Sequence, residues 1–124
     1  MANIQKVLIV DDSRVSRLIS SSILKRLRPE IEIIEAADGS SALSAVNGIT
    51  VDMGIFDLNM PGMDGLELAQ EIRNQQPGTR IALLTANVQD SVRQRAEAMG
   101  ISFFRKPITE NIITQILDEL APAA

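Results

Sequence analysis

The chain has 124 residues, a length that suits one domain, and 45% of them are apolar, which is enough for one core. It contains no Cys and no His, which excludes disulfides, thiolate metal sites, a cysteine nucleophile and any chemistry in which this chain carries phosphohistidine. The net charge of −4 argues against direct nucleic-acid binding, and the early apolar run 7–10 is far too short for a signal peptide or a membrane span. We therefore expect a cytoplasmic protein that contacts neither nucleic acid nor membrane.

Five short apolar runs rich in Ile, Val and Leu predict strands, and the segments between them have helical periodicity. In chain order the strands are 7–10, 31–35, 53–56, 81–84 and 103–104. The first helix carries the stripe Val15, Leu18, Ile19, Ile23 and Leu27, and a weaker, Ala-rich helix spans 40–46. The later helices carry the stripes Leu66, Leu68, Ala69 and Ile72, then Val88, Val92, Ala96 and Met99, then Ile112, Ile113, Ile116, Leu117 and Leu120.

Residues typical of helix ends support these boundaries. Helix starts can be capped at Asp12-Ser13, Asp38, Asp64, Asp90 and Thr109. Gly100 stands where the fourth helix should end, and Gly54 inside the third strand indicates close packing. Strands that alternate with helices imply right-handed crossovers and a parallel sheet covered on both faces. The sequence therefore predicts an α/β fold of five β/α units, a doubly wound five-stranded parallel sheet.

Polar side chains gather at the predicted carboxyl ends of four strands, the edge at which open α/β sheets bind ligands. They are Asp11 and Asp12 after the first strand, Asp57 with Asn59 after the third, Thr85 after the fourth and Lys106 after the fifth. Each has an ordinary explanation alone, such as a helix cap, a turn residue or a solvated surface charge. Their joint occurrence at one edge makes these explanations together improbable.

Three carboxylates placed together repel one another unless a cation joins them. Ligands that are all oxygens suit Mg²⁺, with Mn²⁺ as the second ion that fits. The hydroxyl of Thr85 and the ammonium of Lys106 can then hold phosphoryl oxygens, while one carboxylate attacks phosphorus to form an acyl phosphate. The strand ends thus favour metal-assisted phosphoryl transfer onto an Asp.

Four segments, "VLIVDDS", "DLNMPGMDGLEL", "LLTAN" and "FFRKP", resemble the receiver domain of two-component response regulators, and closely resemble single-domain CheY-like proteins. The resemblance covers nearly the whole chain, so residues 1–124 are expected to form one receiver domain. It implies the flavodoxin-like strand order 2-1-3-4-5 and a role in phosphorelay signal transduction, for which chemotaxis is one pathway that fits.

The resemblance also implies a role for each site residue. Asp57 accepts a phosphoryl group from phosphohistidine on a sensor histidine kinase. Mg²⁺ is held by Asp12, Asp57 and the backbone carbonyl of Asn59, with Asp11 close by or acting through water. Thr85 and Lys106 contact the phosphoryl oxygens, and Lys106–Pro107 resembles the family's cis peptide, which would direct the Lys side chain at the site.

A conformational switch and a hydrolysis path are implied as well. On phosphorylation Thr85 moves toward the new oxygens and Phe103 turns inward; Phe103 lacks the hydroxyl of the Tyr that is frequent there in chemotaxis relatives. Asn59 and Asn87 correspond to positions that flank the path of the attacking water. Both are short neutral amides, so we expect an aspartyl phosphate that lasts seconds to minutes.

Two other functions remain as alternatives. An aspartyl-phosphate phosphatase or transferase of the haloacid-dehalogenase type also uses an Asp nucleophile, but it needs a second Asp two residues later, where this chain has Asn59. A degenerate receiver used only as a scaffold would have lost site residues that are present here. We therefore expect a switch rather than an enzyme, whose output passes through a partner or relay protein or a segment beyond this sequence.

Overall fold

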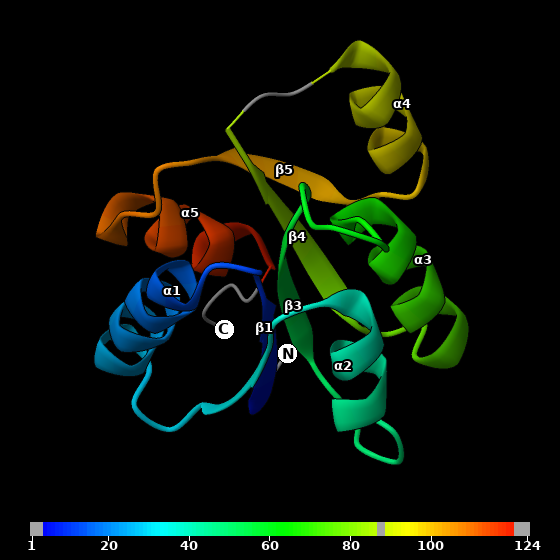
Figure 1. The fold of residues 1–124 in the computed structure, drawn as a ribbon. Coiled ribbons are helices and arrows are strands. Elements are labelled where there is room, and N and C mark those ends of the chain that lie inside the picture. The colour runs from blue at the N-terminus through cyan, green and yellow to red at the C-terminus, as the bar shows by residue number, and fades with distance from the viewer. Residues whose placement is uncertain (1–3, 87–88, 121–124) are drawn as a thin grey trace.

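The computed structural model describes residues 4–86 and 89–120. The five strands are β1 (Lys6–Val10), β2 (Glu32–Ala36), β3 (Met53–Asp57), β4 (Arg80–Thr85) and β5 (Ser102–Arg105). The five helices are α1 (Arg14–Leu27), α2 (Gly39–Ala45), α3 (Gly65–Gln75), α4 (Asp90–Ala98) and α5 (Glu110–Leu120). All neighbouring strands pair in parallel, in the order β2-β1-β3-β4-β5, which confirms the predicted fold and strand order (Figure 1).

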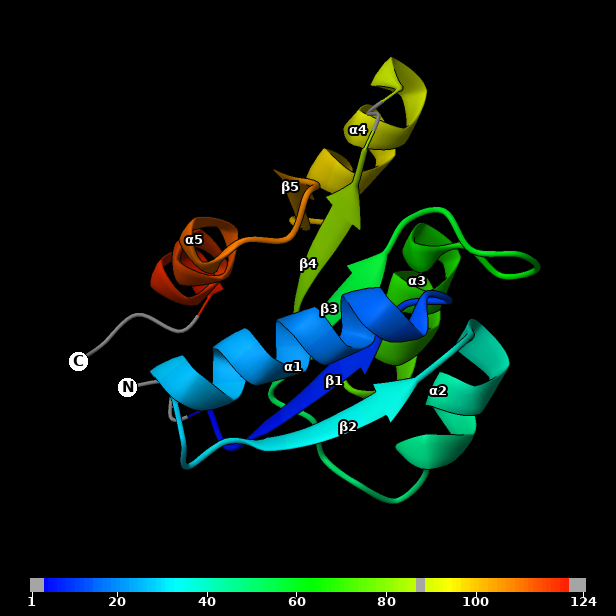
Figure 2. The same ribbon diagram turned by 60° about the vertical axis from the view of Figure 1, so that its left-hand side comes forward.

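The sheet separates two layers of helices. α1 and α5 cover one face, and α2, α3 and α4 cover the other (Figure 2). Alternate residues of the central strands enter the two resulting cores, so that Leu8 and Val10 lie in one core while Val7 and Ile9 lie in the other. Both faces of these strands are therefore buried, which is why their sequences are continuous apolar runs.

Gly54 is required by its neighbour on the same face of β3, Phe56. A Cβ atom added at Gly54 would lie 2.6 Å from the ring of Phe56, which is fully buried. The close packing indicated by the sequence is thus confirmed, and the aromatic ring is accommodated because position 54 has no side chain.

Side-chain caps begin most of the helices. Ser13, Asp38 and Asp64 accept hydrogen bonds from backbone N–H groups at the starts of α1, α2 and α3, and Asp64 forms a capping box with Glu67. The prediction for Asp90 is wrong, because Asp90 is the first helical residue of α4 and the preceding Gln89 makes no side-chain cap hydrogen bond.

The apolar stripe that predicted α1 does not face the core along its whole length. Val15 is 66% exposed and Leu18 is 62% exposed, whereas Ser20 and Leu24 are the buried residues of this helix. The helix itself is confirmed, but its first two turns present apolar side chains to solvent. No helix within the described residues is both long and apolar enough to cross a bilayer.

Candidate functional site

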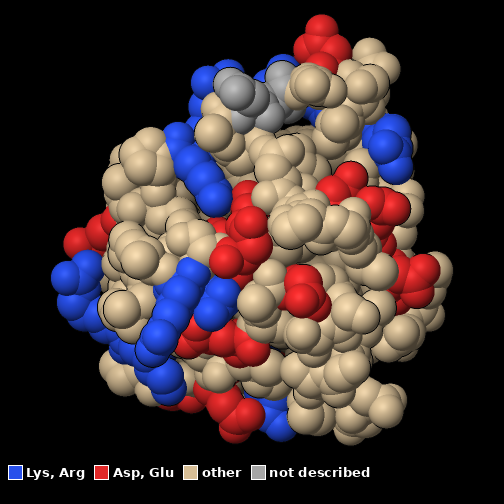
Figure 3. All heavy atoms as spheres, viewed as in Figure 1, with Lys and Arg blue, Asp and Glu red and all other residues tan. Residues whose placement is uncertain are grey.

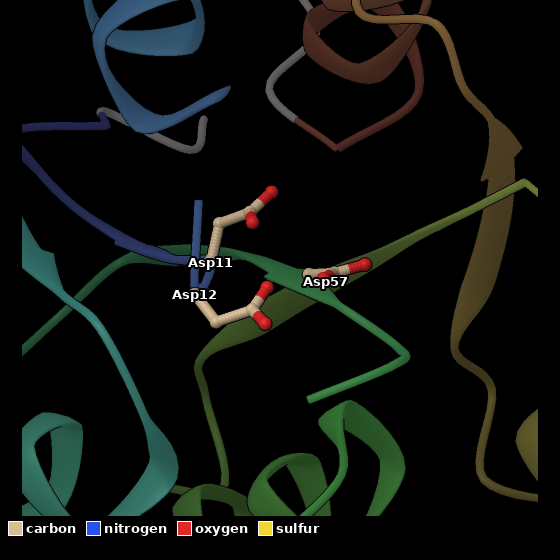
Figure 4. Close-up of side chains that lie close together, drawn as sticks. All are labelled: Asp11, Asp12 and Asp57. Atoms are coloured by element: carbon tan, nitrogen blue, oxygen red, sulfur yellow. The ribbon is translucent and has the colours of Figure 1, made fainter. Parts of the chain in front are cut away.

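Three carboxylates meet where β1 and β3 end. These strands are adjacent, and Val10 pairs with Phe56 in their register, so Asp11 and Asp57 leave the sheet at the same level. Oxygens of Asp11, Asp12 and Asp57 lie within 4.8 Å of one another (Figure 4). Asp11 and Asp57 are buried while Asp12 is exposed, so the cluster opens to solvent on the Asp12 side.

Lys106 supplies the positive charge next to this cluster. Its Nζ lies 3.2 Å from Oδ1 of Asp57 and 3.3 Å from Oδ2 of Asp11. The backbone N–H of Lys106 donates to the carbonyl of Thr85 at 2.9 Å, which ties the loop after β5 to the end of β4. The Lys106–Pro107 peptide is cis, as the resemblance implied. Acidic side chains gather at the centre of this face, with basic side chains beside them (Figure 3).

The surroundings of Asp57 oppose its ionisation. Burial raises the pKa of the Asp57 carboxyl above its usual value, and the charge of Asp11 raises it further. Lys106 and a hydrogen bond from the backbone N–H of Asn59 act in the opposite direction without cancelling the shift. For Lys106, burial lowers the pKa, but the charges of Asp57 and Asp11 outweigh that effect and raise it, so its side chain stays an ammonium ion at neutral pH.

The remaining predicted site residues lie around this centre. Thr85 is the last residue of β4 and is fully buried, and its Oγ1 accepts a hydrogen bond of 3.4 Å from Nδ2 of Asn59. Phe103 is half-buried on β5 and packs against the core shared with α2, α3 and α4. Asn87 lies outside the described residues.

The sequence did not predict two contacts of this site. A Cβ atom at Gly65, the first residue of α3, would lie 2.4 Å from the carbonyl oxygen of Asp57. The guanidinium of Arg17 on α1 donates to the carbonyl of Asp11 at 2.7 Å. The Asp64-Gly65 pair at a helix start was the only sequence signal for the first contact, and an Arg one turn into the helix after Asp11 was the only signal for the second.

The geometry fits a hard divalent cation. The converging donors are all carboxylate oxygens, the ligands that Mg²⁺ accepts, and an exposed side leaves room for the waters that this ion retains. Within the described residues, Asp11, Asp12 and Asp57 are the side chains whose oxygens converge closely enough to hold such an ion. A bound cation would neutralise charge that Lys106 alone offsets incompletely.

A family model and several proteins of known function match this chain in sequence. A model of the response regulator receiver domain matches residues 7–118. The chain is 35% identical to the sensor protein EvgS of Escherichia coli (strain K12) over 95% of this chain and 10% of that protein. It is 37% identical to the cyclic di-GMP phosphodiesterase response regulator RpfG of Xanthomonas campestris pv. campestris (strain 8004), over 82% of this chain and 28% of that protein. The chain thus spans less than a third of the length of these two relatives.

Solved structures show the same fold. The chemotaxis protein CheY4 of Vibrio cholerae has 31% sequence identity and a TM-score of 0.85, with coverage of 95% of this chain and 99% of that chain. The CheY of a CheX–CheY–BeF3–Mg²⁺ complex from Borrelia burgdorferi has 26% identity and a TM-score of 0.80, with coverage of 93% and 87%. With a matching family model over most of its length and a CheY fold, this chain belongs to the response regulator receiver family.

Proposed function

We propose that this receiver domain, residues 1–124, accepts a phosphoryl group on Asp57 and thereby switches its binding of a partner protein. The observation that carries the proposal is the convergence of three carboxylates within 4.8 Å of one another, with the Lys106 ammonium 3.2 Å from Asp57. An ionised carboxylate with a cation beside it is a nucleophile for phosphorus that can approach a charged donor.

The chemistry follows from the placement of the groups. An oxygen of Asp57 forms a bond to phosphorus while the bond from phosphorus to the donor's leaving atom breaks, which yields an acyl phosphate. Lys106 and the hydroxyl of Thr85 hold two of the transferred oxygens. Asp12, Asp57 and the Asn59 carbonyl, with Asp11 nearby, would hold Mg²⁺, whose charge would offset that of the phosphoryl group. Transfer of a phosphoryl group onto Asp57, from a kinase or from a small donor, and hydrolysis of the resulting acyl phosphate are then its reactions, and the protein acts as a switch rather than as an enzyme.

Signalling requires a second arrangement of the same residues. Phosphorylation adds about −1.5 to −2 charges beside Thr85. Thr85 now accepts a hydrogen bond from Asn59, and a move toward the phosphoryl oxygens would break it. Phe103 is half-buried on the neighbouring strand β5, where it pairs with Leu83, two residues before Thr85 on β4, and it would turn toward the space that Thr85 leaves.

The partners follow from the family. The phosphodonor is a sensor histidine kinase, the acceptor of the signal is an output or relay protein, and this protein acts in the cytoplasm. One relative is a sensor protein, and one structural neighbour is a CheY in complex with CheX. The family match favours this function over a phosphatase of the haloacid-dehalogenase type, whose second Asp is replaced here by Asn59.

Acetyl phosphate with Mg²⁺ tests the acceptor. We expect one phosphoryl adduct by mass spectrometry, absent in Asp57→Asn. Lys106→Ala should be phosphorylated more slowly and should lose the NMR shifts of Thr85 and Phe103 that follow activation, because the ammonium no longer reaches the phosphoryl group. An equal adduct in Asp57→Asn would place the acceptor elsewhere.

The lifetime of the aspartyl phosphate tests the hydrolysis path. Asn59 is exposed at the open side of the site, so water can approach Asp57 past a short neutral side chain. We expect loss of radiolabel from the purified phosphoprotein within seconds to minutes, and slower loss in Asn59→Arg and Asn87→Arg. A lifetime of hours in the unsubstituted protein would contradict a rapidly reset signal.

A further inference from the structure

Arg17 joins three parts of the chain at the edge of the acidic cluster. It lies in the first turns of α1, and its side chain is only 17% exposed. Its Nη1 donates to the backbone carbonyl of Asp11 at 2.7 Å, and its Nε lies 3.4 Å from Oε1 of Glu35 on β2. A planar guanidinium can make both contacts at once because its donors point in fixed directions.

Glu35 is itself held in place. Its second carboxylate oxygen, Oε2, accepts a hydrogen bond of 3.2 Å from the hydroxyl of Ser21, one turn further along α1. The guanidinium is therefore fixed from two sides, by the strand that ends beside the cluster and by its own helix.

The carbonyl that Arg17 binds belongs to the peptide unit between Asp11 and Asp12. The other groups of Asp11 are already occupied: its N–H donates to the carbonyl of Ala36, and its Oδ1 accepts from the N–H of Ser13. Asp12 is exposed, and among the described residues its carboxylate accepts no hydrogen bond comparable to the one that Asp11 accepts from Ser13. The direction of its carboxylate thus depends on the orientation of this peptide plane.

We propose that Arg17, anchored by Glu35, is a positioning residue for the Mg²⁺ site: it fixes the Asp11–Asp12 peptide so that the Asp12 carboxylate points at the cation. The inference rests on the proposed function, because it takes Asp12 as a metal ligand. Replacing a side chain that orients a metal ligand without touching the metal typically weakens metal affinity about 10- to 100-fold.

Because Arg17 is positively charged, an electrostatic role and a positioning role predict opposite changes of Mg²⁺ affinity when it is replaced. A positive charge near the cluster repels Mg²⁺, so a purely electrostatic role predicts tighter Mg²⁺ binding in Arg17→Gln. A positioning role predicts the opposite, because the freed peptide lets the Asp12 carboxylate leave the site.

The experiment measures Mg²⁺ affinity by calorimetry and by the NMR shift of the Asp12 amide. We expect Arg17→Gln to bind Mg²⁺ about 10-fold more weakly. Glu35→Gln, which keeps Arg17 but loses its anchor, should show a smaller loss, and the double variant should bind no more weakly than Arg17→Gln alone, because Glu35 acts through Arg17. Phosphorylation by acetyl phosphate should recover in all three at saturating Mg²⁺.

Arg26→Gln is the matched control. Arg26 lies on the same helix in an exposed ion pair with Glu110, 3.0 Å away, so its loss removes the same charge and an ion pair without touching the cluster. We expect its Mg²⁺ affinity to equal that of the unsubstituted protein. Unchanged or tighter binding in Arg17→Gln, or additive losses in the double variant, would overturn the inference. Absence of Mg²⁺ binding by the unsubstituted protein would instead refute the proposed function, and this inference with it.

Discussion

Asp57 occupies a position that favours its neutral form, although the chemistry proposed for it requires the ionised form. Its pKa is raised from the ordinary 3.8, first by burial and then by the charge of Asp11. The folded protein therefore binds a proton at Asp57 more tightly than the unfolded chain does. The contribution of this group to stability is greatest below pH 3.8, and it is lost as the pH rises through the interval between 3.8 and the folded pKa.

We predict that Asp57→Asn is more stable than the unsubstituted protein in the absence of Mg²⁺. At neutral pH the gain should be about 0.5–2 kcal/mol, the range in which functional groups trade stability for activity. Denaturant unfolding at a series of pH values measures it. The difference should grow as the pH rises through the interval above 3.8 and then stay constant. An equal stability of the two proteins at every pH would show that the charge of Asp57 is fully compensated by Lys106.

Gly65 allows α3 to lie against the backbone of Asp57 because it has no side chain. Its N–H donates to the carbonyl of Leu58 at 3.0 Å, and a Cβ atom there would collide with the carbonyl of Asp57. Backbone cannot move aside as the end of a flexible side chain can. We predict that Gly65→Ala costs about 1–3 kcal/mol of unfolding free energy and lowers the rate of phosphorylation by acetyl phosphate.

Gly78→Ala is the control for this substitution. A Cβ atom at Gly78 would meet nothing within 4 Å. Its unfolding free energy should therefore change by no more than about 0.5 kcal/mol, with phosphorylation unaffected. A Gly65→Ala protein that matched this control in both measurements would show that α3 can shift away from Asp57 freely.

At the scale of elements, α1 carries apolar side chains over more of its circumference than the core covers. Leu24 is fully buried, whereas Leu18 is 62% exposed. At 3.6 residues per turn, the two positions lie about 120° apart around the helix axis. We predict that Leu24→Ala lowers the unfolding free energy by about 2–5 kcal/mol, while Leu18→Ala changes it by less than about 0.5 kcal/mol. Denaturant titration of both variants checks this, and similar losses in the two would place Leu18 in the core.

The same helix shows where prediction from sequence stops. The strands, the helices and the polar strand ends were predictable because burial on both faces leaves continuous apolar runs, and because parallel strands bring their carboxyl ends to one edge. The face of α1 that packs against the core could not be predicted. The apolar periodicity identifies the helix, but in the structure Ser20 is buried and Val15 is exposed. The contacts of Gly65 with Asp57 and of Arg17 with Asp11 depend on how α3 and α1 approach the sheet, which no local pattern records.

At the scale of the molecule, the acidic cluster joins the ends of two strands that belong to both cores. A cation held there stabilises the folded chain in proportion to its occupancy, because the unfolded chain has no such site. We predict that Mg²⁺ at ten times its dissociation constant adds about 1.4 kcal/mol to the unfolding free energy and raises the melting temperature. EDTA should reverse the rise. The same Mg²⁺ concentration should have almost no effect on Asp12→Ala, and an equal rise in that variant would mean that Mg²⁺ stabilises the protein at another place.

Lys106 gives this site a counter-ion that cannot diffuse away. Its ammonium lies within 3.3 Å of two of the three carboxylates and is part of the chain, so dilution or chelation does not remove it. Salt screens the ion pairs of Lys106 with Asp11 and Asp57 far less than it screens surface charges, because these pairs are partly buried. The domain can therefore fold and persist at low magnesium, and the divalent ion is left free to exchange. A receiver built in this way needs no magnesium to assemble, and under the proposed function the supply of magnesium and phosphodonor would decide only whether Asp57 is phosphorylated.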